Sequence, residues 1–190
     1  MTDMANLYND IELDATGMRV LAHPVRLALL ERLQLGGPAT ATMLAPQVGA
    51  TPSVASWHLR HLAKHGLVRD ASEARGSGRE RWWEAASRGF RFTGGGEAAR
   101  ALTRVMETVE GDLVGRWRAE VEPTLEPEWL EVAGRSNTRI LVTAAELVDL
   151  EAAIEALLAP FVRRKADGAA VPATARGVRL LRHTMPEGST

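Results

Sequence analysis

Residues 51–68 read TPSVASWHLRHLAKHGLV, and this stretch decides the fold. Thr51 followed by Pro52 is typical of a capped helix start. The threonine hydroxyl can accept from the first unpaired backbone N–H groups, and proline fits the first helical turn. The helix that begins there is predicted to run to about His65, where Gly66 ends it.

The two faces of this helix carry different residues. Ala55, Leu59 and Leu62 recur at helical spacing, which predicts a face packed on the core. The opposite face collects hydroxyl, aromatic and basic side chains: Ser53, Ser56, Trp57, Arg60 and Lys64. Hydroxyls and arginine suit DNA base edges and phosphates, and lysine suits phosphates. A solvated helix face with one stray tryptophan is the alternative interpretation.

The segments on either side of this helix complete a recognisable pattern. Thr40 opens a short helix predicted over 41–48, and Gly49 closes it, so two helices meet at a tight turn. Such a pair can present its second helix to the major groove. After the second helix, residues 67–69 and 80–84 are predicted as two strands of a hairpin, with 74–79 as its tip.

Positive charge gathers in the same region. Residues 51–92 hold eight basic and four acidic side chains, a net charge of +4, in a chain of 190 residues whose net charge is −1. A basic module in an otherwise acidic chain is the electrostatic pattern expected of a phosphate-binding surface.

Three blocks, in this order, resemble the ArsR-type winged helix-turn-helix transcriptional regulators: LAHPVRLALL at 21–30, TPSVASWHLRHL at 51–62 followed by HGLV at 65–68, and GRERWW at 78–83. The resemblance covers residues 15–92, about half of the chain. It implies a mainly α (α+β) winged helix and a homodimer, more often a repressor than an activator. The dimer would bind palindromic double-stranded DNA, with the recognition helix 52–65 in the major groove and the wing 67–85 on the backbone or minor groove. Separately, the absence of cysteine and of an export signal makes the cytoplasm the expected compartment.

The predicted DNA-binding set combines this resemblance with the outer face of the helix. It comprises Thr40, Thr51, Ser53, Ser56, Trp57, Arg60, Lys64, Arg75, Arg79 and Arg81. The competing class is a winged-helix protein-interaction module that does not bind DNA. Such a module should present an apolar or acidic outer face, and Trp57 is the one residue that suits it.

The chain divides into three predicted parts. Residues 1–95 form the DNA-binding domain, and 96–122 form a dimerisation helix. Within that helix, 97–120 carries an apolar stripe for a partner helix: Ala98, Leu102, Val105, Val109, Leu113 and Trp117. Residues 134–190 are predicted as a strand–helix–strand unit, with strands at 138–142 and 177–183 around a helix at 143–164. This unit could sense a small-molecule effector or brace the dimer.

Several function classes are disfavoured by what the sequence lacks. Cysteine is absent, which removes disulfides, thiolate catalysis and the cysteine-based metal sensing used by members of the resembled family. His58, His61 and His65 have a spacing compatible with imidazole ligation, but a packing or DNA-proximal role is the favoured interpretation. We expect no metal, no cofactor and no enzymatic activity. No signal peptide and no apolar run of about 18 residues is present, so we expect neither export nor membrane insertion.

Overall fold

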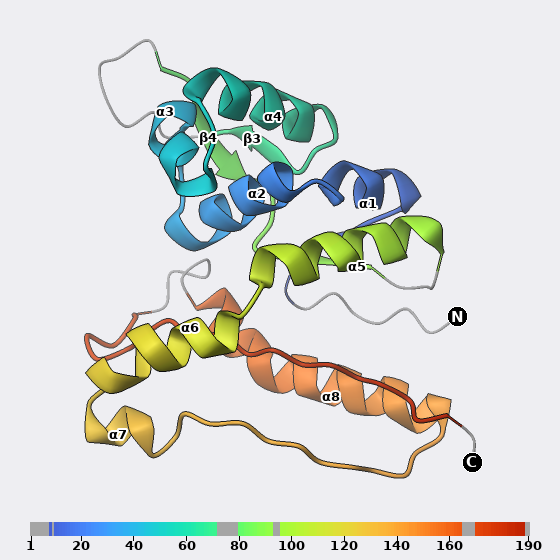
Figure 1. The fold of residues 1–190 in the computed structure, drawn as a ribbon. Coiled ribbons are helices and arrows are strands. Elements are labelled where there is room, and N and C mark those ends of the chain that lie inside the picture. The colour runs from blue at the N-terminus through green and yellow to red at the C-terminus, as the bar shows by residue number, and fades with distance from the viewer. Residues whose placement is uncertain (1–7, 9, 72–79, 93–95, 165–169, 189–190) are drawn as a thin grey trace.

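The computed structural model describes residues 8, 10–71, 80–92, 96–164 and 170–188 (Figure 1). The chain is an α+β winged helix, as predicted, followed by a mainly helical C-terminal half. The winged helix contains α1 (Ala15–Leu21), α2 (Pro24–Gly36), α3 (Ala41–Leu44), a 3-10 turn (Ala45–Val48) and α4 (Pro52–Lys64). None of the described helices is both long and apolar enough to cross a bilayer.

Two small sheets complete the winged helix. β3 (Val68–Asp70) and β4 (Trp82–Ala85) pair antiparallel, with Arg69 opposite Glu84, and this confirms the two predicted strands. The predicted hairpin tip, 74–79, lies outside the described residues. β2 (Ala39–Thr40) adds to the other side of β4, so the strand order is β2-β4-β3. β1 (Ile11–Glu12) pairs in parallel with β5 (Phe90–Arg91), which ties the start of the chain to the exit of the wing.

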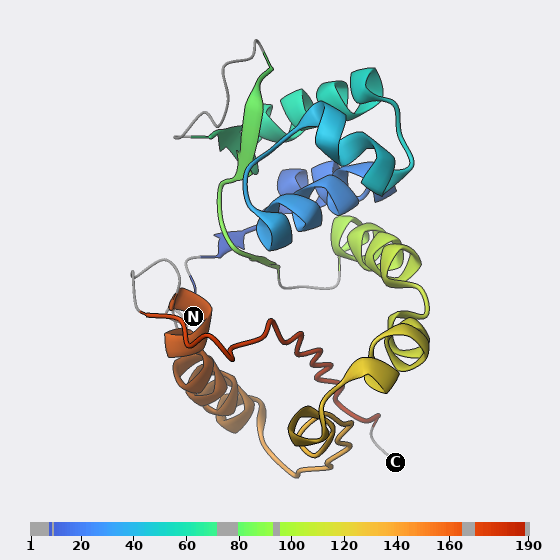
Figure 2. The ribbon, with the colours of Figure 1, turned by 90° about the vertical axis from the view of Figure 1, so that its left-hand side faces the viewer.

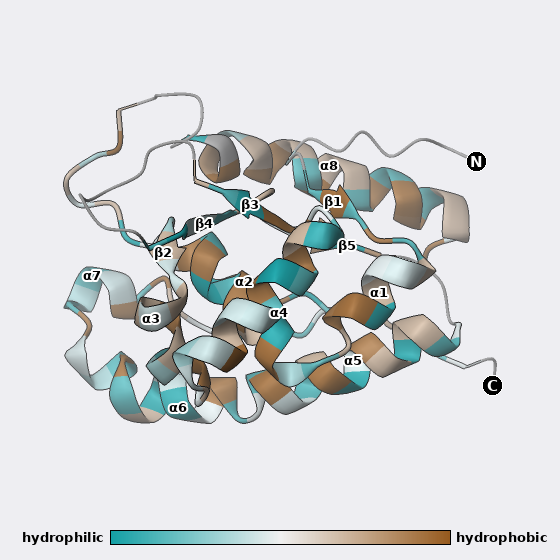
Figure 3. Cartoon of the chain, turned by 90° about the horizontal axis from the view of Figure 1, so that it is seen from above, coloured by the Kyte–Doolittle hydropathy of each residue, from teal (hydrophilic) through white to brown (hydrophobic). Residues whose placement is uncertain are grey.

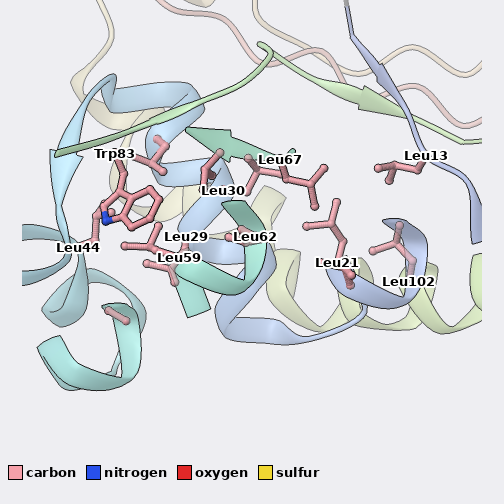
Figure 4. Packing of buried hydrophobic residues seen from close by; sticks show 14 of the residues in the cluster. Leu13, Leu21, Leu29, Leu30, Leu44, Leu59, Leu62, Leu67, Trp83 and Leu102 are labelled. Atoms are coloured by element: carbon pink, nitrogen blue, oxygen red, sulfur yellow. The ribbon is translucent and has the colours of Figure 1, made fainter. Parts of the chain in front are cut away.

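One apolar core holds these elements together (Figure 4). Leucines from α1, α2, α4 and the helix α5 (Glu97–Glu110) meet there: Leu21, Leu30, Leu59 and Leu102, each at most 2% exposed. Trp83 of β4 is 1% exposed and fills the space between the sheet and the helices. Burying large side chains this completely is the main source of stability for the domain. The core therefore fixes α4 against α2 and against the sheet.

The predicted long helix over 97–120 is wrong as a single element. It is divided into α5 (Glu97–Glu110) and α6 (Leu113–Glu120). Gly111 takes a left-handed φ of +50°, and the Asp112 carboxylate accepts from Gly115 N at 2.8 Å to cap α6. Glycine is a poor helix former and aspartate a good cap, so the break follows from local chemistry. The regular apolar stripe does not keep the helix continuous across Gly111. Its first members, Ala98 and Leu102, pack on the core of the same chain.

The two strands predicted within 134–190 are also wrong. Residues 138–142 and 177–183 form no ladder, because no neighbouring strand lies beside them to satisfy their backbone groups. The predicted helix between them is confirmed as α8 (Ala144–Arg163), with the capping box between Thr143 and Glu146. A 3-10 turn (Glu122–Thr124) and α7 (Pro127–Leu130) follow α6, and Figure 2 shows α6, α7 and α8 on the side away from α4.

Burial differs sharply between the two halves. Leu102 is the last buried apolar side chain of the core, and none of the described apolar residues after it is buried. The extensive contacts between elements lie in the winged helix and with α5, apart from those of α6 with the 3-10 turn that follows it. The described residues of the C-terminal half thus form no core of their own.

Candidate nucleic-acid interface

α4 is the element around which the site is built. The Thr51 hydroxyl accepts from Val54 N at 3.3 Å and caps the helix, and Pro52 occupies its first turn. Gly66 follows the helix with φ +71°, a conformation that glycine adopts without strain. Ala55 and Leu59 are fully buried. The predicted boundaries and inner face of this helix are confirmed.

The outer face of α4 presents the predicted residues to solvent. Ser53, Arg60 and Lys64 are exposed, and Ser56 is half-buried. Arg60 donates from Nη2 to Ser56 Oγ at 2.9 Å, so a cation and a hydroxyl are held together on one turn. Figure 3 looks onto this helix where it lies over α2, with hydrophilic and hydrophobic residues alternating along it. The arrangement leaves charged donors on the outside and leucines underneath.

Trp57 lies on the same surface. Its side chain is 57% exposed, and its ring lies nearly parallel to that of His61, with the ring centroids 5.8 Å apart. The stacked imidazole limits the orientations open to the indole. A large aromatic fixed in this way can pack on deoxyribose or on a thymine methyl group.

A cleft of about 350 Å³ opens beside α4. The N-terminal ends of α3 and α4 and the strand β4 contribute to its walls, through Thr42, Ser53, Ser56, Arg60 and Arg81 among others. Helix N-termini carry partial positive charge, and backbone N–H groups there bind phosphate oxygens. Glu80 also lines the cleft, where its carboxylate accepts from Thr42 Oγ1 at 2.7 Å. The cleft is suited to one sugar-phosphate strand running past the helix.

Two further predicted residues, Thr40 and Arg81, serve the surrounding structure. Thr40 is 2% exposed, and its hydroxyl accepts from Met43 N to cap α3. It therefore positions the cleft wall and offers almost no surface to DNA, contrary to its predicted contact. The Arg81 guanidinium donates to the Asp70 carboxylate at 2.9 Å and lies 3.9 Å above the Trp83 ring. This hydrogen bond lowers the pKa of Asp70 and raises the pKa of Arg81.

Ion pairs neutralise some of the basic side chains that the sequence counts toward the positive charge of this region. Arg69 pairs with Glu84 at 2.7 Å, and Arg91 pairs with Glu155 of α8 at 3.2 Å. Arg60 and Lys64 have no carboxylate within ion-pair distance in the described part of the chain. The outer face of α4 thus carries two cations that no described carboxylate neutralises. Arg75 and Arg79 lie outside the described residues.

Sequence reasoning missed a histidine pair beneath this surface. His58 is 6% exposed, and its ring centroid lies 4.6 Å from that of His23 at the start of α2. Nδ1 of each ring is buried without a hydrogen-bond partner among the described residues. Burial lowers the pKa of both imidazoles, and the charges of Arg26 and, for His58, of His23 and His61 lower it further. Within the described ranges, no three metal-ligating side chains gather in one place.

Comparison with known proteins agrees with this geometry over part of the chain. Residues 21–71 match the sequence profile of a family described as a helix-turn-helix domain. The matched segment begins at the end of α1 and ends just after β3, so it contains α2, α3 and the whole of α4. A search of curated proteins found no match to this chain. A helix-turn-helix domain places its second helix in the major groove, which indicates a DNA-binding regulator.

Proposed function

We propose that this protein is a sequence-specific transcriptional regulator of the ArsR type, a homodimeric repressor that binds a palindromic operator. α4 is the recognition helix and enters the major groove, while the hairpin of β3 and β4 follows the backbone or the minor groove. The protein acts by occupying DNA and not by catalysis.

The outer face of α4 carries this proposal. Arg60, Lys64, Ser53 and Ser56 line one exposed side of a helix whose other side is locked into the core by Leu59 and its neighbours. The cleft beside them is lined by Arg60 and by the first turn of α4, which supports a phosphate contact next to the base-reading side chains. These features together fit a B-DNA major groove.

A protein-interaction module is the second candidate, and the exposed apolar residues of α4 favour it. Trp57 is 57% and Val54 is 44% exposed, which is more apolar surface than a solvated helix needs. The arginine and lysine beside them argue for DNA, because cores of protein interfaces are depleted in lysine.

Selection from a random duplex library separates the two candidates. The purified full chain is incubated with the library at 150 mM salt, and bound duplexes are sequenced over several rounds. Enrichment of a motif with two inverted half-sites about one helical turn apart is the expected result. Enrichment of no motif, with weak binding that salt abolishes, would instead favour the protein-interaction module.

A further inference from the structure

α8 exposes an apolar stripe along one face. Leu150 is 38%, Leu157 72% and Phe161 66% exposed. Spacings of seven and four residues place these three side chains on the same side of a helix. Ala153, also exposed, lies between them on that side. The α8 stripe, defined as Leu150, Ala153, Leu157 and Phe161, is therefore a continuous apolar surface over three turns.

The rest of the chain holds α8 by its polar side. Glu155 is 8% exposed and forms a bidentate ion pair with Arg91. The distances are 3.2 Å from Nη1 to Oε1 and 3.3 Å from Nη2 to Oε2. Glu151 accepts from Thr184 Oγ1 at 2.9 Å and pairs with Arg182 at 3.1 Å. By helical geometry Glu155 lies almost opposite the α8 stripe. The helix thus turns Glu151 and Glu155 toward the rest of the chain and leaves Leu150 and Leu157 exposed to solvent. A helix that packs only within its own chain has the opposite arrangement.

The two ends of the α8 stripe carry opposite charges, and these charges indicate which kind of partner surface would pack on the stripe. Glu146 lies one turn before Leu150 on the same face, and Arg164 lies about one turn after Phe161. The Arg164 guanidinium lies 5.2 Å from the Phe161 ring, so that positive charge stands directly over the apolar surface. A surface that is acidic at one end, apolar in the middle and basic at the other is complementary to itself when turned end for end.

We propose that the α8 stripe packs antiparallel against the α8 stripe of a second copy of this chain. This inference rests on the homodimer of the proposed function and assigns the surface that forms it. Leu150 then faces Phe161 of the partner subunit across a two-fold axis near the middle of the helix. Glu146 faces Arg164 of the partner subunit, and the same pair recurs at the other end. Two helices joined in this way form an isologous interface with closed symmetry.

The oligomeric state of matched variants tests the surface. Leu157→Asp places a charge in the middle of the stripe, and Leu35→Asp makes the same change at the end of α2, at a side chain that is 78% exposed. In analytical ultracentrifugation of the full chain, we expect Leu157→Asp to raise the dimer dissociation constant at least tenfold and Leu35→Asp to leave it unchanged. Circular dichroism checks that both variants fold. Equal effects of the two variants, or a monomeric wild-type chain, would overturn the proposal.

Single cysteines test the antiparallel register, because the native chain contains none. Under mild oxidation, a mixture of Leu150→Cys and Phe161→Cys chains should form a cross-linked pair containing one of each. Neither variant alone should cross-link, because antiparallel packing holds identical positions far apart. Cross-linking of Leu150→Cys with itself would show parallel packing and refute the inference.

The library selection keeps this inference separate from the function on which it rests. A wild-type chain that enriches a DNA motif but sediments as a monomer would refute the α8 pairing and leave DNA binding standing. A dimer that Leu157→Asp dissociates, with no motif enriched, would support the α8 pairing and refute the regulator.

Discussion

Arg60→Ala is the substitution that tests the recognition surface most specifically. Arg60 is exposed on α4, and its one described hydrogen bond is to the neighbouring Ser56 hydroxyl at 2.9 Å. Removing an exposed hydrogen bond of this kind changes the free energy of unfolding by about 0.5 kcal/mol or less. Any large loss of DNA affinity in the variant is therefore a loss of contact with DNA and not of fold.

The size of the loss depends on what the guanidinium touches. An arginine that reads a guanine edge contributes about 1–3 kcal/mol of discrimination, which is about 5- to 160-fold in dissociation constant. That loss should appear on the selected duplex and be much smaller on a scrambled one. A phosphate contact would weaken binding to both duplexes and reduce the slope of log K against log salt by about 0.9.

Fluorescence anisotropy with labelled duplexes measures both quantities, between 50 and 300 mM salt. Arg104→Ala is the matched control, because Arg104 is exposed on α5 and α2 lies between α5 and α4 (Figure 1). The control should bind as the wild type does. Unchanged affinity of Arg60→Ala for both duplexes would refute the assignment of the outer face of α4 to DNA.

Three further predictions concern stability, measured by urea unfolding. Trp83→Ala should lower the free energy of unfolding by about 3–5 kcal/mol, because a side chain that is 1% exposed leaves a cavity under the sheet; a loss below about 1 kcal/mol would contradict the packing. Thr51→Ala should cost about 1 kcal/mol through the lost cap of α4 and Thr51→Ser almost nothing, so equal losses would refute the capping role. The wild type should be fully stabilised above the ordinary histidine pKa of 6.5 and lose stability as the pH falls below it, since burial lowers the pKa of His23 and His58 in the folded chain. His58→Gln should weaken that pH dependence, and a slope equal to that of the wild type would rule out the pair as its source.

The sequence predicts the winged helix well because its signals are local. Thr51, Pro52 and Gly66 mark the ends of α4 by cap and turn chemistry, and the structure confirms both ends. Leu59 and Leu62 reveal the inner face by spacing alone. Once the buried face is known, the residues on the opposite face are expected to be exposed. Most of the predicted DNA-binding residues on that face are exposed in the structure.

The sequence fails where the outcome depends on partners distant along the chain. In the sequence, Thr40 is a hydroxyl residue close to the recognition helix and is predicted to contact DNA. In the structure its side chain is buried, and its hydroxyl caps α3. Residues 138–142 have strand propensity and find no strand to pair with. The break at Gly111 and Asp112 is an exception, because glycine and an aspartate cap are local signals that the regular stripe on 97–120 obscures. The packing of the first half on α1 and α2 is the part that depends on distant residues. The His23–His58 contact joins two helices and leaves no periodic signal.

The most direct test of the account is the ratio of two affinities at 150 mM salt. The dissociation constant of the full chain is measured by anisotropy for the selected palindromic duplex and for a scrambled duplex of the same composition. The account predicts that the selected duplex binds at least about 1,000-fold more tightly, as specific DNA-binding proteins do. A ratio near one would contradict it, because the outer face of α4 would then carry charge without reading sequence.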